Sequence, residues 1–253
     1  MSKFSEWCAP AETPVSTHML KLLKVDPVKR AHAVGVLAKS LPGYYADPDR
    51  LSGLLNRLGR PAVANYVQEK LPTSKQIRSG DLGEVLCNAY VIEGTAFKLG
   101  IKRLRWKDHR NMSMRGEDVL AFNLNGPGRT LNVLKAEVKS RAAMSTSVIE
   151  EARSALDSNK DLPSAHAISF VADRLTGASD VELRNALDDA LLKDGLKGSQ
   201  VTHMLFTFSG NNPSKLLKTN LTNYVGNTQQ SYVALQVDLH PIFVKDVFEA
   251  VER

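Results

Sequence analysis

The segment LKAEVKSR, residues 134–141, places an acid between two lysines on one face of a predicted strand. Alternate side chains of a strand point to the same side, so Lys135, Glu137 and Lys139 share a face. Leu131 lies upstream on that face, which therefore begins apolar and ends charged. Because a core strand gains little from such charges, we interpret the end of this strand as a place where chemistry is carried out.

A second acid lies on an otherwise apolar strand face. In the segment GEDVLAFNL, Asp118 shares its face with three apolar side chains. The turn-rich sequence NGPGRT separates the predicted strands 117–124 and 130–140, which indicates an antiparallel hairpin. In such a hairpin the start of one strand lies beside the end of the other. We therefore expect Asp118 next to Glu137 and Lys139.

Two carboxylates and an ammonium group at one end of a sheet are suited to holding a hard divalent cation. Mg²⁺ prefers oxygen ligands, and proteins supply one or two carboxylates while water and substrate phosphates supply the rest. We expect Asp118 and Glu137 to be ligands of Mg²⁺ or Mn²⁺, with the carbonyl of Val138 as a third. Lys139 would face the attacking water or offset negative charge that develops during phosphodiester hydrolysis. Glu84, on the helix before the strands, could reach the same site.

Each of these groups also has a structural interpretation. Glu137 and Lys139 could form an exposed ion pair at a strand end, which contributes almost nothing to stability. The segment from Asp81 to Glu84 could be a helix start, with Asp81 as the cap and Glu84 reaching back. The convergence of Asp118 with Glu137 favours metal chemistry for the strand residues, whereas both interpretations of Glu84 stay open.

The elements that must position these residues follow from the spacing of apolar side chains. Residues 1–74 are expected to form a helical N-terminal region, with helices that begin at Asp26-Pro27 and Asp47-Pro48. The order of elements in residues 75–253 predicts an α/β fold, with a mixed central sheet flanked by helices and a helical N-terminal extension. Strands are expected at about 96–106, 117–124, 130–140, 202–209 and 231–239, and helices at about 79–94, 143–158, 164–174, 180–192 and 241–253.

A basic run, KRLRWKDHR, occupies residues 102–110. It could clamp a phosphate backbone while its tryptophan stacks on a base, or it could be a solvated edge strand whose charges prevent aggregation. Two further cations flank the acid-x-Lys motif and could touch phosphates or lie on a solvated rim. The candidate nucleic-acid-binding residues are Lys102, Arg103, Arg105, Trp106, Lys107, Arg110, Lys135 and Arg141.

The bulk composition limits the other classes of function. A net charge of +6 in 253 residues favours a polyanionic partner. The two cysteines, Cys8 and Cys87, form no CxxC motif, so neither a zinc site nor a disulfide framework is expected. The N-terminus lacks the pattern of a signal peptide and no apolar run is long enough to span a bilayer, so we expect a cytoplasmic protein without a membrane partner.

The order of the candidate residues resembles the PD-(D/E)XK nuclease superfamily. Glu84 lies on a helix, Asp118 lies in a strand, and the acid-x-Lys motif ends the next strand. The resemblance spans about residues 75–210 and implies a restriction-endonuclease-like core, so that 75–253 would be a nuclease domain. One departure is that Glu117, rather than a proline, precedes Asp118.

The layout SGDLGEVL, RGEDVLAF and LKAEVKS, after a helical N-terminus, further resembles the HamA family, the nuclease subunit of the Hachiman anti-phage defence system. The resemblance implies a Mg²⁺-dependent endonuclease that acts on DNA and has a helicase subunit, HamB, as its heteromeric partner. The chain has no Gly-rich Walker loop, so it is not expected to supply an ATP-driven motor itself.

Two other classes of function are compatible with parts of the sequence. A nuclease-fold protein can be a non-catalytic module that binds nucleic acid or docks and regulates a helicase. The retention of competent residues at Asp118, Glu137 and Lys139 argues against this alternative. An enzyme acting on small phosphorylated substrates ranks last, because the chain has no glycine loop that could cradle a phosphate.

Overall fold

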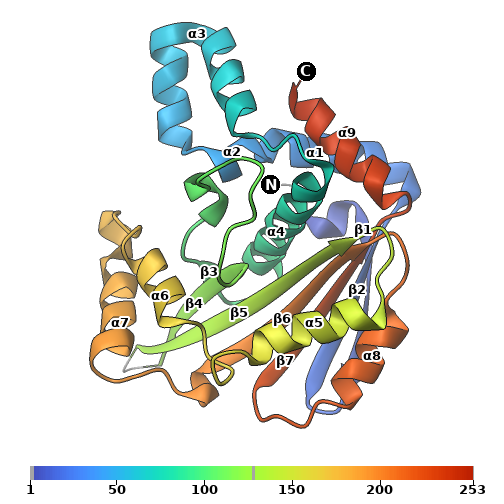
Figure 1. Cartoon of the computed structure of the whole chain (residues 1–253), viewed down its shortest axis with the longest axis vertical. Helices are drawn as coiled ribbons and strands as arrows, with labels where there is room; N and C mark the ends of the chain where they lie inside the picture. The colour runs from blue at the N-terminus through green and yellow to red at the C-terminus, as the bar shows by residue number, and fades with distance from the viewer. Residues whose placement is uncertain (1–2, 127–128, 253) are drawn as a thin grey trace.

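A computed structural model describes residues 3–126 and 129–252, and within them seven strands form one mixed sheet. The strand order is β1-β2-β7-β6-β5-β4-β3 (Figure 1). Strands β2, β7, β6 and β5 are parallel, whereas β1 at one edge and β4 and β3 at the other pair antiparallel to their neighbours. The strands are β1 Cys8–Val15, β2 His18–Val25, β3 Lys98–Leu99, β4 Val119–Asn125, β5 Thr130–Arg141, β6 Val201–Ser209 and β7 Gln229–Gln236.

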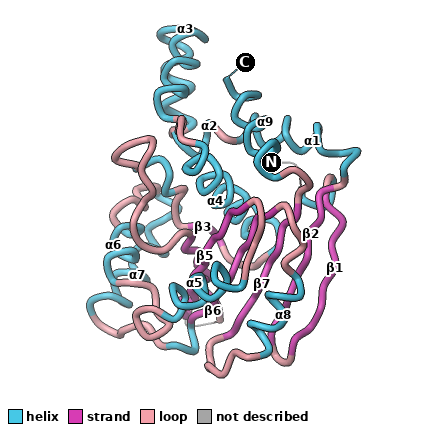
Figure 2. Tube along the Cα trace, turned by 45° about the vertical axis from the view of Figure 1, so that its right-hand side comes forward, coloured by secondary structure: helices cyan, strands magenta, loops and turns pink. Residues whose placement is uncertain are grey.

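Helices cover both faces of this sheet, and three apolar clusters hold the layers together. On one face, α4 packs against β4, β5 and β6, α9 packs against α4, and α1 packs against α9. On the other face, α5 and α8 cover the parallel strands, while α6 and α7 cover β4 and the first half of β5 (Figure 2). The helices are α1 Arg30–Ser40, α2 Pro42–Tyr45, α3 Pro48–Lys70, α4 Lys75–Gly94, α5 Thr146–Asp157, α6 Ala165–Ala172, α7 Val181–Leu192, α8 Ser214–Thr222 and α9 His240–Glu252.

The predicted α/β architecture and its helical N-terminal part are confirmed. Both predicted helix starts are found, since the side chain of Asp26 accepts a hydrogen bond from the N–H of Val28 and that of Asp47 accepts one from Asp49. Helix α3 projects from the body of the molecule and is kinked at Gly59, where φ is 78° (Figure 1). None of the helices in the described ranges is both long and apolar enough to cross a bilayer.

The prediction of a helical region over 1–74 is wrong for residues 8–25. These residues form the hairpin of β1 and β2, and β2 joins the sheet by pairing in parallel with β7. The leucines and lysines of β2 favour a helix when considered locally. Pairing with a strand more than 200 residues away buries Leu20 and Leu23, and this tertiary interaction outweighs the local preference. The division of the chain into regions 1–74 and 75–253 stays a prediction.

The strand expected at 96–106 is also much shorter than predicted, because only Lys98–Leu99 pairs with β4. At Gly100 the backbone comes so close to Val171 and Phe122 that an added Cβ would lie 2.6 and 2.7 Å from their side chains. The chain then leaves the sheet, and Arg103–Trp106 form a short 3-10 helix. The basic run therefore lies on a loop beside α4 instead of on an edge strand.

Candidate active site

Asp118 and Glu137 lie beside each other at one end of the β4–β5 hairpin. Asp118 directly precedes β4, whose first residue, Val119, pairs with Ala136. The Oδ2 atom of Asp118 accepts a hydrogen bond of 2.8 Å from the backbone N–H of Val138. The predicted antiparallel hairpin and the predicted proximity of the two acids are confirmed.

Glu84 reaches the same place from α4, and an arginine connects it to Asp118. The guanidinium of Arg103 donates two hydrogen bonds of 2.9 Å to the carboxylate of Glu84 and one of 3.0 Å to Oδ1 of Asp118. It also donates to the backbone carbonyl of Glu117 at 2.6 Å. Two carboxylates from different elements thus share one nearly buried cation.

Close packing of α4 on β5 fixes the position of Glu84. A Cβ added to the neighbouring Gly83 would lie 3.0 Å from the side chain of Val138 and 3.2 Å from that of Ser140. The absence of a side chain at residue 83 therefore lets the helix approach the strand at the acid-x-Lys motif. The helix-capping interpretation of Glu84 is wrong, because α4 begins at Lys75, more than two turns earlier.

Lys139 lies between two carboxylates. Its Nζ atom is 2.9 Å from Oε1 of Glu137 and 2.8 Å from Oε1 of Glu151 on α5. Burial lowers the pKa of Lys139, but the hydrogen bonds to Glu151 and Glu137 outweigh it, so the pKa lies above its ordinary value. Lys139 is therefore protonated at neutral pH and acts as a hydrogen-bond donor, not as a base.

The acids of the site repel one another in a poorly solvated environment. Burial raises the pKa of Asp118, and the neighbouring charges of Glu137 and Glu84 raise it further. Burial also raises the pKa of Glu137, although Lys139 opposes this effect. Asp118 keeps 20% of its side chain exposed and Glu137 16%, so both remain accessible to solvent. Raised pKa values in a partly open cluster are typical of functional sites.

The donor atoms of this cluster suit a hard divalent cation, but the described arrangement is not a complete metal site. The side chains of Glu84, Asp118 and Glu137 offer carboxylate oxygens, which Mg²⁺ prefers, and burial and neighbouring acids raise the pKa values of Asp118 and Glu137 although Arg103 and Lys139 lie beside them. Among residues 3–126 and 129–252, however, no three acidic, histidine or cysteine side chains are grouped as metal ligands. Arg103 holds two of the acids instead. Metal binding stays a prediction.

Most cations of the predicted nucleic-acid-binding run are paired within the protein. Arg103 binds the acids described above, and the guanidinium of Arg105 donates to Asp47 and to the carbonyl of Gly43. Lys107 forms a buried ion pair of 2.7 Å with Asp81. These contacts anchor the loop to α2, α3 and α4, so for Arg103, Arg105 and Lys107 the structure favours an internal role.

The other candidates of that set differ in how accessible they are. Trp106 is 36% exposed, and the ammonium of Lys102 lies 4.3 Å from the centre of the Tyr44 ring. Arg110 donates to the carbonyl of Gln68, and Arg141 is exposed. Stacking on a base by Trp106 and phosphate contacts by Lys102, Arg110 and Arg141 stay predictions.

Lys135 does not lie on a solvated rim, which corrects the prediction for this residue. Its side chain is buried, and its ammonium donates to the backbone carbonyls of Leu156, Ser158 and Leu162. These carbonyls lie in the last turn of α5 and in the segment after it, where helix carbonyls lack partners within the helix. Lys135 therefore fastens α5 to the sheet and cannot reach a phosphate.

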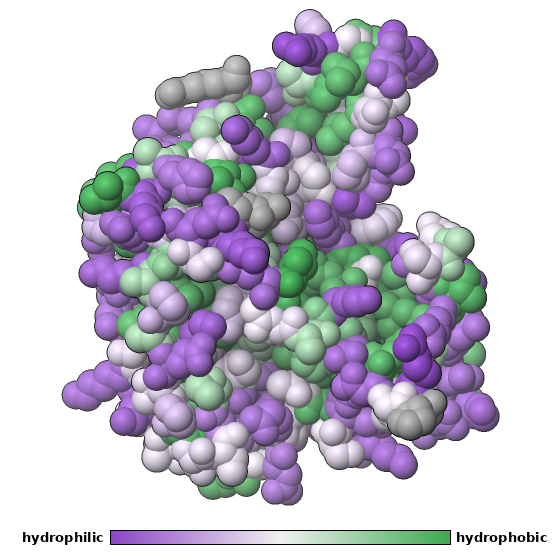
Figure 3. Space-filling view, turned by 180° about the vertical axis from the view of Figure 1, so that it is seen from behind, coloured by the Kyte–Doolittle hydropathy of each residue, from purple (hydrophilic) through white to green (hydrophobic). Residues whose placement is uncertain are grey.

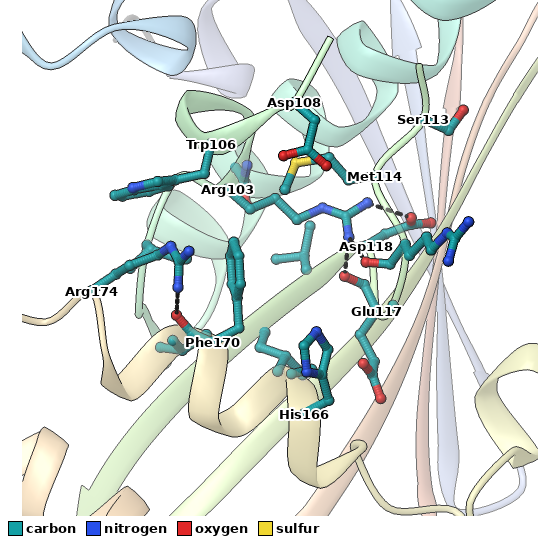
Figure 4. Close-up of a pocket in the computed structure, with 18 of the residues that line it drawn as sticks. Arg103, Trp106, Asp108, Ser113, Met114, Glu117, Asp118, His166, Phe170 and Arg174 are labelled. Atoms are coloured by element: carbon teal, nitrogen blue, oxygen red, sulfur yellow. Dashed lines mark hydrogen bonds and ion pairs between the residues drawn. The ribbon is translucent and has the colours of Figure 1, made fainter.

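A cavity of about 510 Å³ opens beside Asp118 (Figure 4). Arg103 and Asp118 lie at one end of it, and the side chains of Trp106, Phe170 and Arg174 gather at the other. Sequence reasoning singled out Trp106 but missed Phe170 and Arg174, which lie on and just after α6 and are far from the motif in sequence. It also missed the pairing role of Arg103 and the contact of Glu151 with Lys139.

Glu117, to which the sequence gave no role, holds α6 in place at this cavity. Its carboxylate accepts hydrogen bonds from the backbone N–H and the hydroxyl of Ser164. Ser164 is also the N-cap of α6, because its hydroxyl accepts from the N–H of Ala167. The helix that carries one wall of the cavity is therefore attached directly to the residue before Asp118.

Comparison with known proteins finds similarity over nearly the whole chain. The family model named HamA matches residues 2–251. The Hachiman protein HamA of Bacillus cereus is 24% identical over 237 residues, which cover 92% of this chain and 84% of that protein.

Proposed function

Since the chain belongs to the HamA family, we propose that it is a metal-dependent deoxyribonuclease, the effector subunit of a helicase-coupled anti-phage defence complex. Its relative in Bacillus cereus is named a Hachiman protein, which supports a role in defence. The reaction is hydrolysis of DNA phosphodiester bonds in the cytoplasm, and the partner is a helicase subunit of the HamB type.

The observation that carries the nuclease proposal is the meeting of Asp118, Glu137 and Lys139 at one open end of the β4–β5 hairpin. Burying two acids side by side costs stability, because their charges repel and both lose water. Burial and the charges of Glu137 and Glu84 raise the pKa of Asp118, and burial raises the pKa of Glu137. A cluster that opposes folding in this way is better explained by a function than by a structural need.

In this proposal the carboxylates of Asp118 and Glu137 and the carbonyl of Val138 hold Mg²⁺ or Mn²⁺. The metal would polarise the scissile phosphate and acidify a water molecule. The N–H of Val138 orients the carboxylate of Asp118. The ammonium of Lys139 donates to the attacking water or to a phosphate oxygen and so offsets developing negative charge. Glu151 keeps Lys139 protonated and directs its ammonium towards Glu137.

Membership of the PD-(D/E)XK superfamily is part of the same proposal. Helix α4 is followed by β3, β4 and β5, then by α5 and later by β6, which is the order of the superfamily core. The candidate residues lie at the expected places in that order, with Glu84 on α4, Asp118 at the start of β4 and the motif near the end of β5.

A second function is favoured by one specific observation. Arg103 already pairs with Glu84 and Asp118, as expected of a nuclease fold that no longer binds metal. Such a protein would bind DNA or dock a helicase without cutting. Binding of Mg²⁺ by the wild type that disappears in Asp118→Asn would support the nuclease, whereas no binding to either protein would support the non-catalytic module.

The proposed function is tested by incubating supercoiled plasmid and linear DNA with the chain alone and with the helicase subunit encoded beside it. We expect Mg²⁺-dependent cleavage in at least one of the two preparations, and none with EDTA. Cleavage only in the presence of the helicase would identify a regulated effector. DNA binding without cleavage in both preparations would contradict the nuclease proposal.

A further inference from the structure

We propose that the cavity beside Asp118 holds one unstacked nucleobase of the strand that is cut, so that unpaired DNA is the preferred substrate. This inference rests on the proposed nuclease function and names its substrate more closely. The base would lie against Trp106, Phe170 and Arg174 while the adjoining phosphate reaches the acids at the other end of the cavity.

The cavity has the size and lining of a site for a small planar group. Its volume of about 510 Å³ lies in the range of small-molecule sites. Its apolar lining includes Ile101, Met114, Leu120, Ala167 and Val171. Since Arg103 and Asp118 line the same space, a ligand in it is directly adjacent to the acid cluster.

Two aromatic rings and a guanidinium form a stacking surface at the far end (Figure 4). The rings of Trp106 and Phe170 meet edge to face with their centres 6.4 Å apart. The guanidinium carbon of Arg174 lies 3.5 Å from the centre of the Phe170 ring and 5.5 Å from that of Trp106. Aromatic and guanidinium planes are the surfaces on which proteins stack unpaired bases.

Arg174 keeps hydrogen-bonding capacity that the protein does not use. It donates to the carbonyl of Phe170 at 3.0 Å, but within residues 3–126 and 129–252 it pairs with no carboxylate. Its Nε atom is buried and has no hydrogen-bond partner in the same part of the chain. Arg174 lines the cavity and is only half-buried, so its guanidinium can donate to a ligand there, and pairing its donors would remove a cost to stability. The exposed Asp108 on the cavity wall adds an acceptor, and the edges of bases carry both kinds of group.

Cations around the cavity offer a path for the rest of the strand. A second hollow, of about 640 Å³, shares Ile101, Trp106 and Arg174 with the cavity and extends towards α3. Seen from behind, the surface is hollowed below the projecting α3, and apolar side chains line the hollow (Figure 3). The cations Arg50, Lys70 and Lys102 line it, together with the Arg105–Asp47 ion pair and Asp180. A hollow with an excess of cations that continues into a stacking surface is typical of proteins that bind single strands.

The geometry favours unpaired DNA because a base in an intact duplex is stacked between its neighbours. Such a base must be turned out of the helix before it can enter a cavity, and this costs free energy. A single strand, or a duplex that a helicase has opened, does not incur this cost. The proposed partner and the proposed base site therefore favour the same substrate.

Tryptophan fluorescence tests the proposal without any cleavage. The chain has two tryptophans, and the indole N–H of the fully buried Trp7 lacks a partner in the described residues, so Trp7→Phe breaks no hydrogen bond there and leaves Trp106 as the reporter. The full-length Trp7→Phe protein is titrated in EDTA with a single-stranded oligonucleotide, the matching duplex and a deoxynucleoside monophosphate. We expect quenching by the single strand, and at least tenfold weaker effects of the other two ligands.

The contribution of the stacking surface is measured by the affinity for a fluorescent single strand. We expect Trp106→Leu to weaken the affinity for the single strand about tenfold and Trp106→Phe to restore most of that affinity. The affinity for the duplex should change less than about twofold in either variant. The matched control is Tyr224→Leu, because Tyr224 also faces a guanidinium, that of Arg153 at 4.9 Å, but lies outside the cavity. Circular dichroism checks that each variant is folded.

The outcomes separate this proposal from the nuclease proposal. Absence of quenching by the single strand, or equal affinity of wild type and Trp106→Leu, would overturn the base site even if the protein cuts DNA. Binding of the mononucleotide as tightly as the strand would also overturn it, since the cavity would then be a site for free nucleotides. Stacking of a base on Trp106 in a protein that does not cut DNA would support the base site and contradict the nuclease proposal.

Discussion

The Nη2 atom of Arg103 lies 3.0 Å from Oδ1 of Asp118, so the guanidinium is bonded to one of the two carboxylates predicted to bind metal. The same guanidinium also holds Glu84. Burial lowers the pKa of Arg103, but the charges of Glu84 and Asp118 outweigh it and raise the pKa above its ordinary value. A divalent cation must therefore compete with a permanent charge that the chain itself supplies.

We predict that Arg103→Gln binds Mg²⁺ about three- to tenfold more tightly than the wild type, because a nearby positive charge is removed. Without metal, the variant should lose about 2–4 kcal/mol of unfolding free energy, since buried carboxylates are left unpaired. Isothermal titration calorimetry measures the first effect and urea denaturation the second.

The matched control for this prediction is Arg105→Gln, because Arg105 lies on the same turn but pairs with Asp47, away from the acids. It should leave Mg²⁺ affinity unchanged. Weaker metal binding by Arg103→Gln would contradict the prediction and would mean that the guanidinium positions the carboxylates for the metal.

Lys135→Met should destabilise the protein by about 2–5 kcal/mol, because three backbone carbonyls at and after the end of α5 lose their shared donor. Urea denaturation followed by circular dichroism measures the loss. Arg141→Met serves as the control, since Arg141 is exposed and its guanidinium donates to the carbonyl of the preceding Ser140. A stable Lys135→Met variant with weakened DNA binding would show that Lys135 contacts phosphates after all.

Acid should destabilise the protein through His203. Burial lowers the pKa of this histidine from 6.5 to about 4; the hydrogen bond from its Nε2 to the carbonyl of Asp161 opposes the shift, and the charge of Arg153 adds to it. A histidine whose folded pKa is lowered takes up its proton first in the unfolded state. Its contribution to stability is therefore fully present above about pH 6.5 and is lost as the pH falls towards 4.

This loss amounts to up to about 3 kcal/mol between pH 7.5 and pH 4.5. Urea unfolding at several pH values should show a smaller loss for His203→Gln than for the wild type. His109→Gln, at an exposed position, is the control and should follow the wild type. Equal pH dependence of all three proteins would contradict the assignment to His203.

Alternation of side chains along two strands was enough to predict that Asp118 and Glu137 meet. The hairpin is local in sequence, its turn is marked by glycine and proline, and a charged residue on an apolar face stands out against its neighbours. The same reasoning predicted the α/β order after residue 75, because long amphipathic helices and strands carry their own periodicity.

Contacts between distant segments could not be predicted in this way. Arg103 resembles the other cations of its run, and only the path of the loop after Gly100 brings it to Glu84 and Asp118. In the sequence nothing distinguishes Glu151 from its exposed neighbour Glu150. Only the packing of α5 on the sheet brings Glu151 to Lys139. The same holds for β2, which becomes a strand because β7 lies beside it.

The central claim is that Glu137 belongs to a metal site that cuts DNA. The most direct measurement compares nicking of supercoiled plasmid by the wild type, Glu137→Gln and Glu150→Gln, each with the helicase subunit present and with either Mg²⁺ or EDTA. We predict Mg²⁺-dependent nicking by the wild type and by Glu150→Gln, a variant at an exposed position on α5, and a rate at least about 100-fold lower for Glu137→Gln. Nicking by Glu137→Gln at the wild-type rate would contradict the claim.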